Sequence, residues 1–418
     1  MYLSKKAKKE RKKGNILYKI ENFAHLNIKT LILIYLITRL SFIFLLTQVT
    51  WNNESVICYA SDCKQHWRNS QFVVSGLSPY KIWKEEGLNL PLPHRADHPP
   101  LLYVLMPFFV WIWKDVWAML LMFFLFDFIN LLLVYSLGKF RKISSLLYIF
   151  APSIFRGLLF AEDEIFTIAF ILASVYFFRK KKYTTSTIML ALSFNIHFFP
   201  IVLFPILLLN MNVIEKKEEK GKILLPFPKE IEYGKIIKYL GMFLLTSAIC
   251  HLFFFPDWIM FYKYRTFNFT LTSTGSGIWH LLQISPSKFY IPTLLFSFLI
   301  FYLYSYLKNL NIETGYLLSS LLFITFFPRV AMDHFIFILP LFLIWTKLTK
   351  LEIFSWLVLF VGVIAEFLAL PSVNILQISH ISSYNFRVLI LLFIIFIFYI
   401  PIIKNLVYDK EGRDAIKK

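Results

Sequence analysis

Charged residues are scarce in this chain, and their scarcity excludes an ordinary soluble protein. Only 17% of the 418 residues are charged, whereas 58% are hydrophobic and the mean hydropathy is +0.62. A soluble protein of this length needs more charge to cover its surface. Long apolar runs recur along the whole sequence instead, and no soluble domain or short repeat stands out. The composition therefore predicts an all-α polytopic membrane protein.

Cysteine is also scarce, and the three cysteines do not have the spacing of a zinc site. Cys250 lies in an apolar run, where we expect a small core residue. Cys58 and Cys63 share one polar segment. A disulfide between them is compatible with the sequence but not required by it, because nearness along the chain does not ensure the geometry of a disulfide.

The net charge of +19 comes from Lys and Arg clusters that flank apolar runs. This is the pattern of the positive-inside rule, so the charge reports topology and contact with anionic lipid head groups rather than a nucleic-acid partner. The first cluster precedes an apolar run that starts near Ile28 and continues for about 20 residues, too long and too late for a cleaved signal peptide. We expect an uncleaved first span with its basic end in the cytosol.

The alternation of apolar runs and basic clusters predicts about 12 crossings with both termini inside. The expected spans are Leu31–Val49, Val116–Leu137, Ile143–Phe160, Ile165–Phe178, Thr184–Asn210 (two short crossings broken near His197–Pro200), Ile236–Phe255, Ile291–Leu307, Gly315–Phe327, Met332–Trp345, Phe354–Leu370 and Val388–Ile403. Leu101–Trp113 is too short to cross and predicts a half-helix in the outer leaflet.

These spans divide the chain into two membrane modules. We expect a cytosolic basic N-terminus at 1–27, a first module at 28–210 with a large outer loop at 51–100, a cytosolic loop at 211–235, a second module at 236–404 with an outer loop at 256–290, and a cytosolic tail at 405–418. The short tip at Glu162, Asp163 and Glu164 falls outside. Carboxylates at the bilayer centre cost about 2.5 kcal/mol or more each, so we expect these three at the outer surface or in a wet cavity.

The predicted outer side gathers carboxylates, histidines and arginines close to the membrane. A carboxylate can deprotonate a hydroxyl group or hold a divalent cation, whereas Arg, Lys and His can hold a phosphate. Such a face suits a reaction between a lipid-linked phosphate and a hydroxyl group. Asp62 is the candidate general base, or otherwise a solvated loop acid. Asp163 either positions the acceptor or a metal, or is a solvated turn residue or helix N-cap.

Further candidates lie on other tips of the same side. His197 either lines the cavity or satisfies polar groups beside the break at Pro200. Arg329 and His334 are candidate phosphate ligands, with a topology anchor as the alternative for the arginine. Arg265 in the second outer loop has a similar standing. Asp127 and Glu366 lie inside apolar spans, where charged groups face the bundle and pair, so we expect structural roles for them.

Three stretches together resemble the GT-C glycosyltransferases that use polyprenyl-phosphate sugars, above all the GPI mannosyltransferase I type and its archaeal and bacterial relatives. They are Asp62 with Phe72–Tyr80 and His98–Tyr103, then Ala151–Ile165, and then Leu190–Pro205. The sequence departs from the family at two places. Asp62-Cys63-Lys64 stands where the family commonly has Asp-x-Asp, and Ala161-Glu162 replaces the usual Gly and Asn or Gln before the second Asp.

The resemblance implies a GT-C-like fold and an inverting transfer of a sugar, mannose by analogy, from a dolichyl- or polyprenyl-phosphate donor to a lipid-linked glycan or glycolipid. The reaction would take place on the lumenal or external face of the endoplasmic reticulum membrane in a eukaryote or the plasma membrane in a prokaryote. Asp62 would be the catalytic base, and Glu162, Asp163, His98, His197, Arg265, Arg329 and His334 would bind substrate. A divalent cation, Mg²⁺ or Mn²⁺, is an open question.

Two alternatives remain open from the sequence. A transporter or flippase of a lipid-linked substrate would show repeated halves and polar sites at mid-membrane, whereas the polar groups here gather at one face. A noncatalytic subunit of a membrane glycosylation complex would tolerate the altered motifs.

Overall fold

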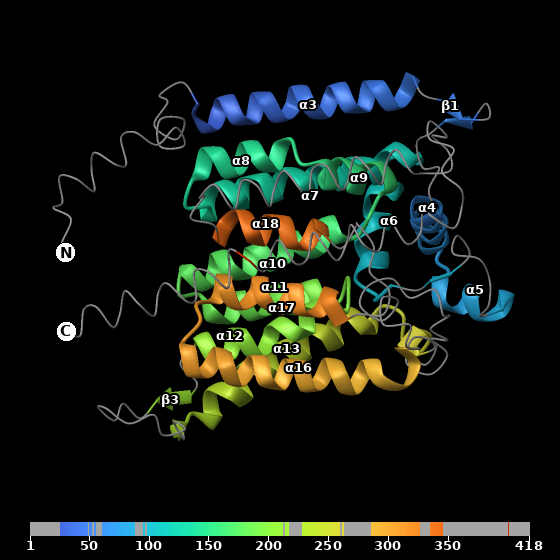
Figure 1. Cartoon of the computed structure of the whole chain (residues 1–418). Helices are drawn as coiled ribbons and strands as arrows, with labels where there is room; N and C mark the ends of the chain where they lie inside the picture. Colours follow the sequence, from blue (N-terminus) through green and yellow to red (C-terminus); the bar gives the residue numbers. More distant parts are fainter. Residues whose placement is uncertain are drawn as a thin grey trace.

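The structure, a computed structural model, describes residues 26–48, 50–51, 54–55, 61–87, 95–96, 98–211, 214–216, 228–259, 261–262, 286–326, 335–345 and 400. The described part is almost entirely α-helical, and most helices lie roughly parallel or antiparallel in one bundle (Figure 1). Two short antiparallel strand pairs complete it, β1 (Thr50–Trp51) with β2 (Glu54–Ser55) and β3 (Ile214–Lys216) with β4 (Pro228–Ile231).

The helices follow one another with short connections through the first half of the chain. They are α3 (Ile28–Gln48), α4 (Ser61–Val74), α5 (Pro79–Glu86), α6 (Leu102–Ile112), α7 (Val116–Leu137), α8 (Arg141–Ile149), α9 (Pro152–Phe160), α10 (Glu164–Arg179), α11 (Tyr183–Phe194), the 3₁₀ helix η2 (Phe199–Leu203), α12 (Phe204–Asn210), α13 (Tyr233–Leu252), α16 (Pro286–Lys308), α17 (Ile312–Phe326) and α18 (Phe335–Trp345).

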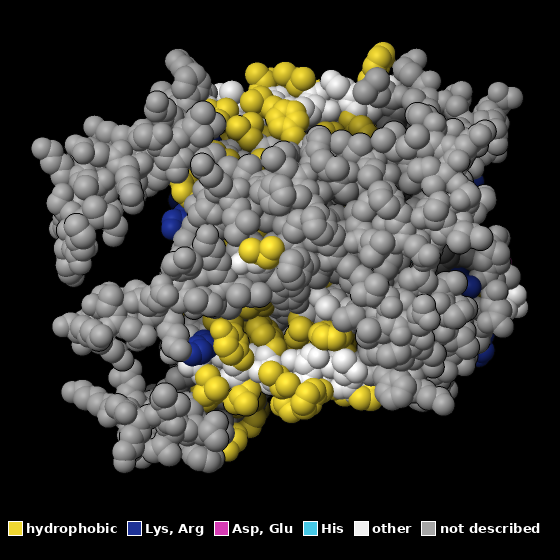
Figure 2. All heavy atoms as spheres, viewed as in Figure 1, with side chains coloured by type: hydrophobic (Ala, Val, Ile, Leu, Met, Phe, Trp, Pro, Cys, Tyr) yellow, Lys and Arg dark blue, Asp and Glu magenta, His cyan; other side chains and the backbone are white. Residues whose placement is uncertain are grey.

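Three of the described helices are long and apolar enough to cross a membrane, namely α7, α13 and the Ile291–Lys308 part of α16. Large apolar side chains are exposed along α3, α13 and α16, and Figure 2 shows them as yellow patches at the upper and lower edges of the molecule. Apolar surface of this extent suits contact with lipid rather than water. The predicted helical membrane protein is confirmed at this level.

Helix α10 forms the centre of the bundle and packs against α7, α9, α11 and α18. Its side chains are buried around most of its circumference, as expected for a helix without a polar face. Helix α17 approaches α12 closely at Gly315, where an added Cβ would lie 2.4 Å from Cγ2 of Ile206. Only a glycine allows this spacing of the two helices.

The predicted span boundaries hold for α7 and fail for the segment that follows. Helix α7 occupies Val116–Leu137 as predicted, because the side chain of Asp115 accepts a hydrogen bond from the backbone N–H of Trp117 and starts the helix. The single span expected at Ile143–Phe160 is wrong, since the segment forms two short helices, α8 and α9. Pro152 causes the break: it disfavours helical backbone at Ala151 and begins α9.

The interruption at 51–100 is not simply a loop, because its described part contains the helices α4 and α5. Gly76, with φ 77°, makes the turn between them, and Ser78 caps α5 by accepting from the N–H of Lys81. Cys63 in α4 is disulfide-bonded and Cys250 is free. Cys58, for which the sequence left a pairing with Cys63 open, lies outside the described residues.

A buried polar network joins α3, α7 and α8. The side chain of Arg39 forms an ion pair with Asp127, and Tyr35 and Tyr148 each donate a hydrogen bond to the same carboxylate. Arg39 also donates to the backbone carbonyl of Ile149. The expectation that Asp127 faces the bundle and pairs is confirmed, whereas Glu366 lies outside the described residues.

The bundle has two chemically different ends. Helix α7 starts, and α10 starts, at the end where α4 and α5 lie, and both helices finish at the opposite end (Figure 1). The basic stretches 139–142 and 179–182 follow directly after α7 and α10 and therefore lie at this opposite end. The end with α4 and α5 carries the cluster described next.

Candidate functional site

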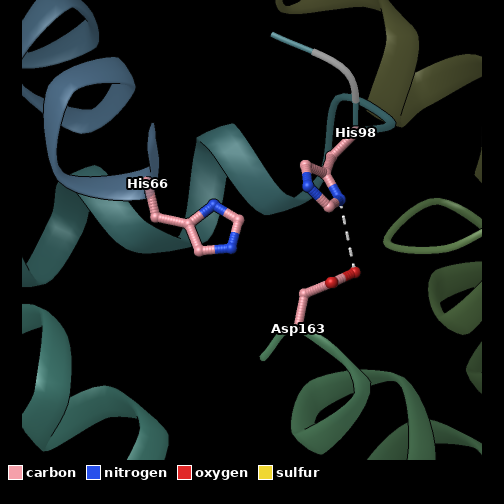
Figure 3. Close-up of side chains that lie close together, drawn as sticks. All are labelled: His66, His98 and Asp163. Carbon is pink, nitrogen blue, oxygen red and sulfur yellow. Dashed lines mark ion pairs between the residues drawn. The ribbon is translucent and has the colours of Figure 1, made fainter. Parts of the chain in front are cut away.

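Three polar side chains from separate segments meet at the α4 end of the bundle (Figure 3). His66 lies in α4, His98 precedes α6, and Asp163 occupies the turn between α9 and α10. Nδ1 of His98 is 3.4 Å from Oδ2 of Asp163, and the two imidazole centroids are 5.0 Å apart. One ligand atom from each of the three residues lies within 4.8 Å of the others. We call these residues the His-His-Asp cluster.

His66 reaches the cluster because α4 turns a polar face toward the protein interior. Gln65, His66, Asn69 and Ser70 are all buried. The side-chain amides of Gln65 and Asn69 both donate to the backbone carbonyl of Arg95, at 2.9 and 2.8 Å. These two bonds tie the segment before His98 to α4, so both histidines are placed by the same contact.

The backbone of His98 is held on both sides. Its carbonyl accepts a hydrogen bond of 2.7 Å from the hydroxyl of Tyr80, which is fully buried within a small aromatic core formed by α5, α6 and the residues after α13. Three residues later, the N–H of Leu101 donates to the carbonyl of Asn195 at the end of α11. The imidazole therefore projects from a fixed connection rather than from a free chain.

Asp163 follows a tight turn at the end of α9. Ala161 takes the left-handed conformation, with φ 55° and ψ 49°, and the N–H of Glu162 donates to the carbonyl of Gly157. Asp163 stands at the position before α10, yet its side chain makes no capping bond and points toward His98 instead (Figure 3). The reading of Asp163 as a solvated turn residue or N-cap is wrong.

The electrostatic surroundings of Asp163 oppose each other. Burial by itself raises the pKa of the Asp163 carboxyl, but the nearby imidazoles of His98, His197 and His66 favour its charged form and hold the pKa below its ordinary value. A carboxyl with a lowered pKa is ionised throughout the neutral range. The cluster thus contains a buried carboxylate that can accept protons, hold a cation or orient a hydroxyl group.

His197 lies near this carboxylate and also serves the local backbone. Its Nδ1 accepts a hydrogen bond of 3.3 Å from the N–H of Phe199, at the start of η2, and its ring packs edge-on against Phe337. Both interpretations of His197 thus have support. Asn195, in the same stretch, is buried and donates to Ala191 and Ser247, so it links α11 to α13.

The other predicted site residues have mixed outcomes. Asp62 lies in the first turn of α4, four residues before His66, a spacing that puts two positions on one face of a helix. Glu162 is buried beside Asp163, and Glu164 is buried at the start of α10. The expectation that these acids sit at the surface is wrong. Arg265, Arg329 and His334 lie outside the described residues.

His66 is the functional candidate that the sequence reading missed. Its signal was the four-residue spacing from Asp62, which becomes informative only if the segment is helical. Because this stretch was expected to be a loop, the periodicity carried no weight.

No family model matches the chain, and no curated protein matches it. The chemistry of the cluster therefore has to be read from its own residues. Two imidazoles and one carboxylate can act as acid and base, bind an anionic phosphate when the imidazoles are protonated, or hold a divalent metal ion.

Proposed function

We propose that the chain is an integral membrane glycosyltransferase of the GT-C kind, which moves a sugar from a polyprenyl- or dolichyl-phosphate donor to a lipid-linked glycan or glycolipid. One observation carries the proposal. The three stretches that resemble this family are far apart in sequence, yet they meet around the His-His-Asp cluster. His98 comes from the first, Asp163 from the second, and His197 with Asn195 from the third.

The proposed reaction is a direct, inverting displacement. The acceptor hydroxyl loses its proton to the carboxylate of Asp62, and its oxygen forms a bond to the anomeric carbon of the sugar. The bond between that carbon and the phosphate oxygen breaks, and the lipid phosphate leaves with the electron pair. The ionised Asp163 orients the acceptor, with Glu162 beside it. Histidines and arginines, namely His98, His197, Arg265, Arg329 and His334, bind the leaving phosphate.

The proposal includes the finer topology predicted from the sequence. About 12 crossings place the basic stretches after α7 and α10 in the cytosol and the α4 end on the lumenal or external side. The membrane is the endoplasmic reticulum in a eukaryotic cell or the plasma membrane in a prokaryotic one. Lipid donors and acceptors would reach the cluster from the leaflet next to the short helix α6.

The test is a transfer assay with the purified full chain in lipid vesicles, supplied with radiolabelled polyprenyl-phosphate mannose and a membrane lipid extract as acceptor. Wild-type protein should produce labelled glycolipid. Asp62→Asn should lower the rate by about 10²- to 10⁴-fold, the usual contribution of a general base. Glu85→Gln, on the exposed surface of α5, is the matched control and should retain the wild-type rate.

Two results would contradict the proposal. If wild-type vesicles move labelled donor lipid between leaflets without forming product, the protein is a flippase. If neither activity occurs until another membrane protein is added, and Asp62→Asn then behaves as wild type, the chain is a noncatalytic subunit. Full activity of Asp62→Asn in the first assay would remove that residue from its role as base.

A further inference from the structure

We propose that the His-His-Asp cluster is a binding site for one divalent transition-metal cation of the Zn²⁺ class. The inference concerns His66, His98 and Asp163 alone and does not depend on glycosyl transfer. Two imidazoles and a carboxylate from three different segments converge on one point, each with an atom that can ligate a metal (Figure 3). Three protein ligands of this kind recur in metal sites that keep a further position open for water or substrate.

The spacing of the ligand atoms fits such an ion. Zn²⁺ lies about 2.0–2.2 Å from nitrogen and oxygen ligands in a tetrahedral arrangement, which puts two ligands about 3.4 Å apart. Nδ1 of His98 and Oδ2 of Asp163 are already separated by 3.4 Å. The nitrogen of His66 completes the set within 4.8 Å, and a movement of roughly 1–1.5 Å by rotation of its ring closes the remaining gap.

Asp163 has a second reason to hold a cation. Its carboxylate is buried, and within the described part of the chain Oδ2 makes no hydrogen bond of ordinary geometry. The residue 3.4 Å away, His98, is an imidazole, which carries little positive charge at neutral pH when its pKa is ordinary. A buried carboxylate needs a full positive charge nearby, and a divalent ion between Asp163 and the two imidazoles supplies it.

The ligand types select the class of ion. Mg²⁺ and Ca²⁺ prefer oxygen ligands almost exclusively, whereas imidazole nitrogen suits Zn²⁺, Co²⁺, Fe²⁺ and Mn²⁺. The cluster offers two nitrogens for one carboxylate. It therefore favours a transition metal over Mg²⁺, and within the neutral first-row ions Zn²⁺ over Mn²⁺.

The surroundings of the ligands are preorganised as metal sites require. Gln65 and Asn69 hold the segment before His98 against α4, and Tyr80 fixes the carbonyl of His98 itself. Contacts of this outer kind set the direction of the imidazoles, and their loss costs about 10- to 100-fold in metal affinity in known sites.

The test measures metal binding to the untagged, full-length protein in detergent after treatment with a chelator. Titration with Zn²⁺ against a competing chelator should reveal one saturable site per chain, and Co²⁺ should produce the visible absorption bands of a low-symmetry tetrahedral complex. His66→Gln, His98→Gln and Asp163→Asn should each lower Zn²⁺ affinity by more than the 10- to 100-fold expected from loss of an outer contact. His251→Gln is the matched control, because His251 contacts Tyr262 and the carbonyl of Ser247 rather than the cluster.

Three outcomes would overturn the site. They are no saturable binding of Zn²⁺ or Co²⁺ by wild-type protein, unchanged binding by all three ligand variants, and equal loss in His251→Gln. Size-exclusion profiles identify any variant that fails to fold, and the wild-type stoichiometry decides the question if all three do. Because no donor lipid is present, the result is separate from the outcome of the transfer assay.

Discussion

The guanidinium of Arg39 in α3 lies 2.8 Å from the carboxylate of Asp127 in α7, and both side chains are almost completely buried. Removing one partner of such a pair leaves a charge in an apolar interior, so Asp127→Asn should destabilise the protein by about 3–5 kcal/mol. Chemical unfolding in detergent, followed by tryptophan fluorescence, measures the change.

A double replacement and an exposed pair provide the controls for this prediction. Arg39→Met combined with Asp127→Leu should lose less stability than Asp127→Asn, because no uncompensated charge remains. Glu86→Gln breaks the partly exposed pair with Arg68 and should cost no more than about 1 kcal/mol. Equal losses in both single variants would show that burial of the Arg39 pair has no special effect.

The close approach of α17 and α12 should make Gly315→Ala destabilising by about 1–3 kcal/mol, the usual cost of overpacking a core. The obstacle is Cγ2 of Ile206, which moves only if the restricted χ1 of a β-branched side chain changes. Ile206→Leu removes this methyl group and should restore part of the loss in the double variant. Gly241→Ala in α13, where nothing lies within 4 Å of the added Cβ, should be neutral or slightly stabilising.

The hydroxyl of Tyr80 should matter for both stability and metal binding. Tyr80→Phe removes its bond to the carbonyl of His98 and should cost about 0.5–1.5 kcal/mol of stability, with a fall in Zn²⁺ affinity of about 10-fold or more. Tyr302→Phe removes an equivalent 2.7 Å bond to the carbonyl of Val202, away from the cluster. It should lose similar stability with unchanged affinity. A loss of affinity in both variants would point to a general effect on the fold.

The turn before Asp163 should accept glycine better than it accepts alanine. Ala161 has a positive φ, which costs an alanine roughly 1 kcal/mol and costs a glycine little. Ala161→Gly should therefore be neutral or stabilise by up to about 1 kcal/mol. Ala169→Gly, inside α10, should lose about 1 kcal/mol or more by the same unfolding assay. Clear destabilisation by Ala161→Gly would mean that the methyl group packs more favourably than the backbone strain costs.

The sequence predicted the helices in which apolar length or a capping residue decides the structure. Val116–Leu137 is the best example, since Asp115 marks its start and Gly138 follows its end. It also predicted the break near Pro200 and the pairing of Asp127. The division of the Ile143–Phe160 run was missed because a uniform apolar pattern concealed the effect of Pro152 on Ala151.

The cluster could be predicted only in part. Asp163 and His98 were identified as site residues, but their contact depends on the path of the chain between α6 and α9, which local pattern does not encode. His66 was missed because its role depends on α4 being helical and on Asn69 and Gln65 binding the carbonyl of Arg95. The burial of Glu162 and Asp163 follows from packing of the surrounding helices, so residue type alone pointed to the surface.

The left-handed backbone of Ala161 has one more consequence. A glycine would adopt this turn by itself, whereas an alanine adopts it only when the contacts of α9 and α10 compensate for the strain. The direction of the Asp163 side chain is therefore a property of the assembled bundle. A peptide containing only the α9–α10 segment should relax out of the turn and leave its aspartate without a defined partner.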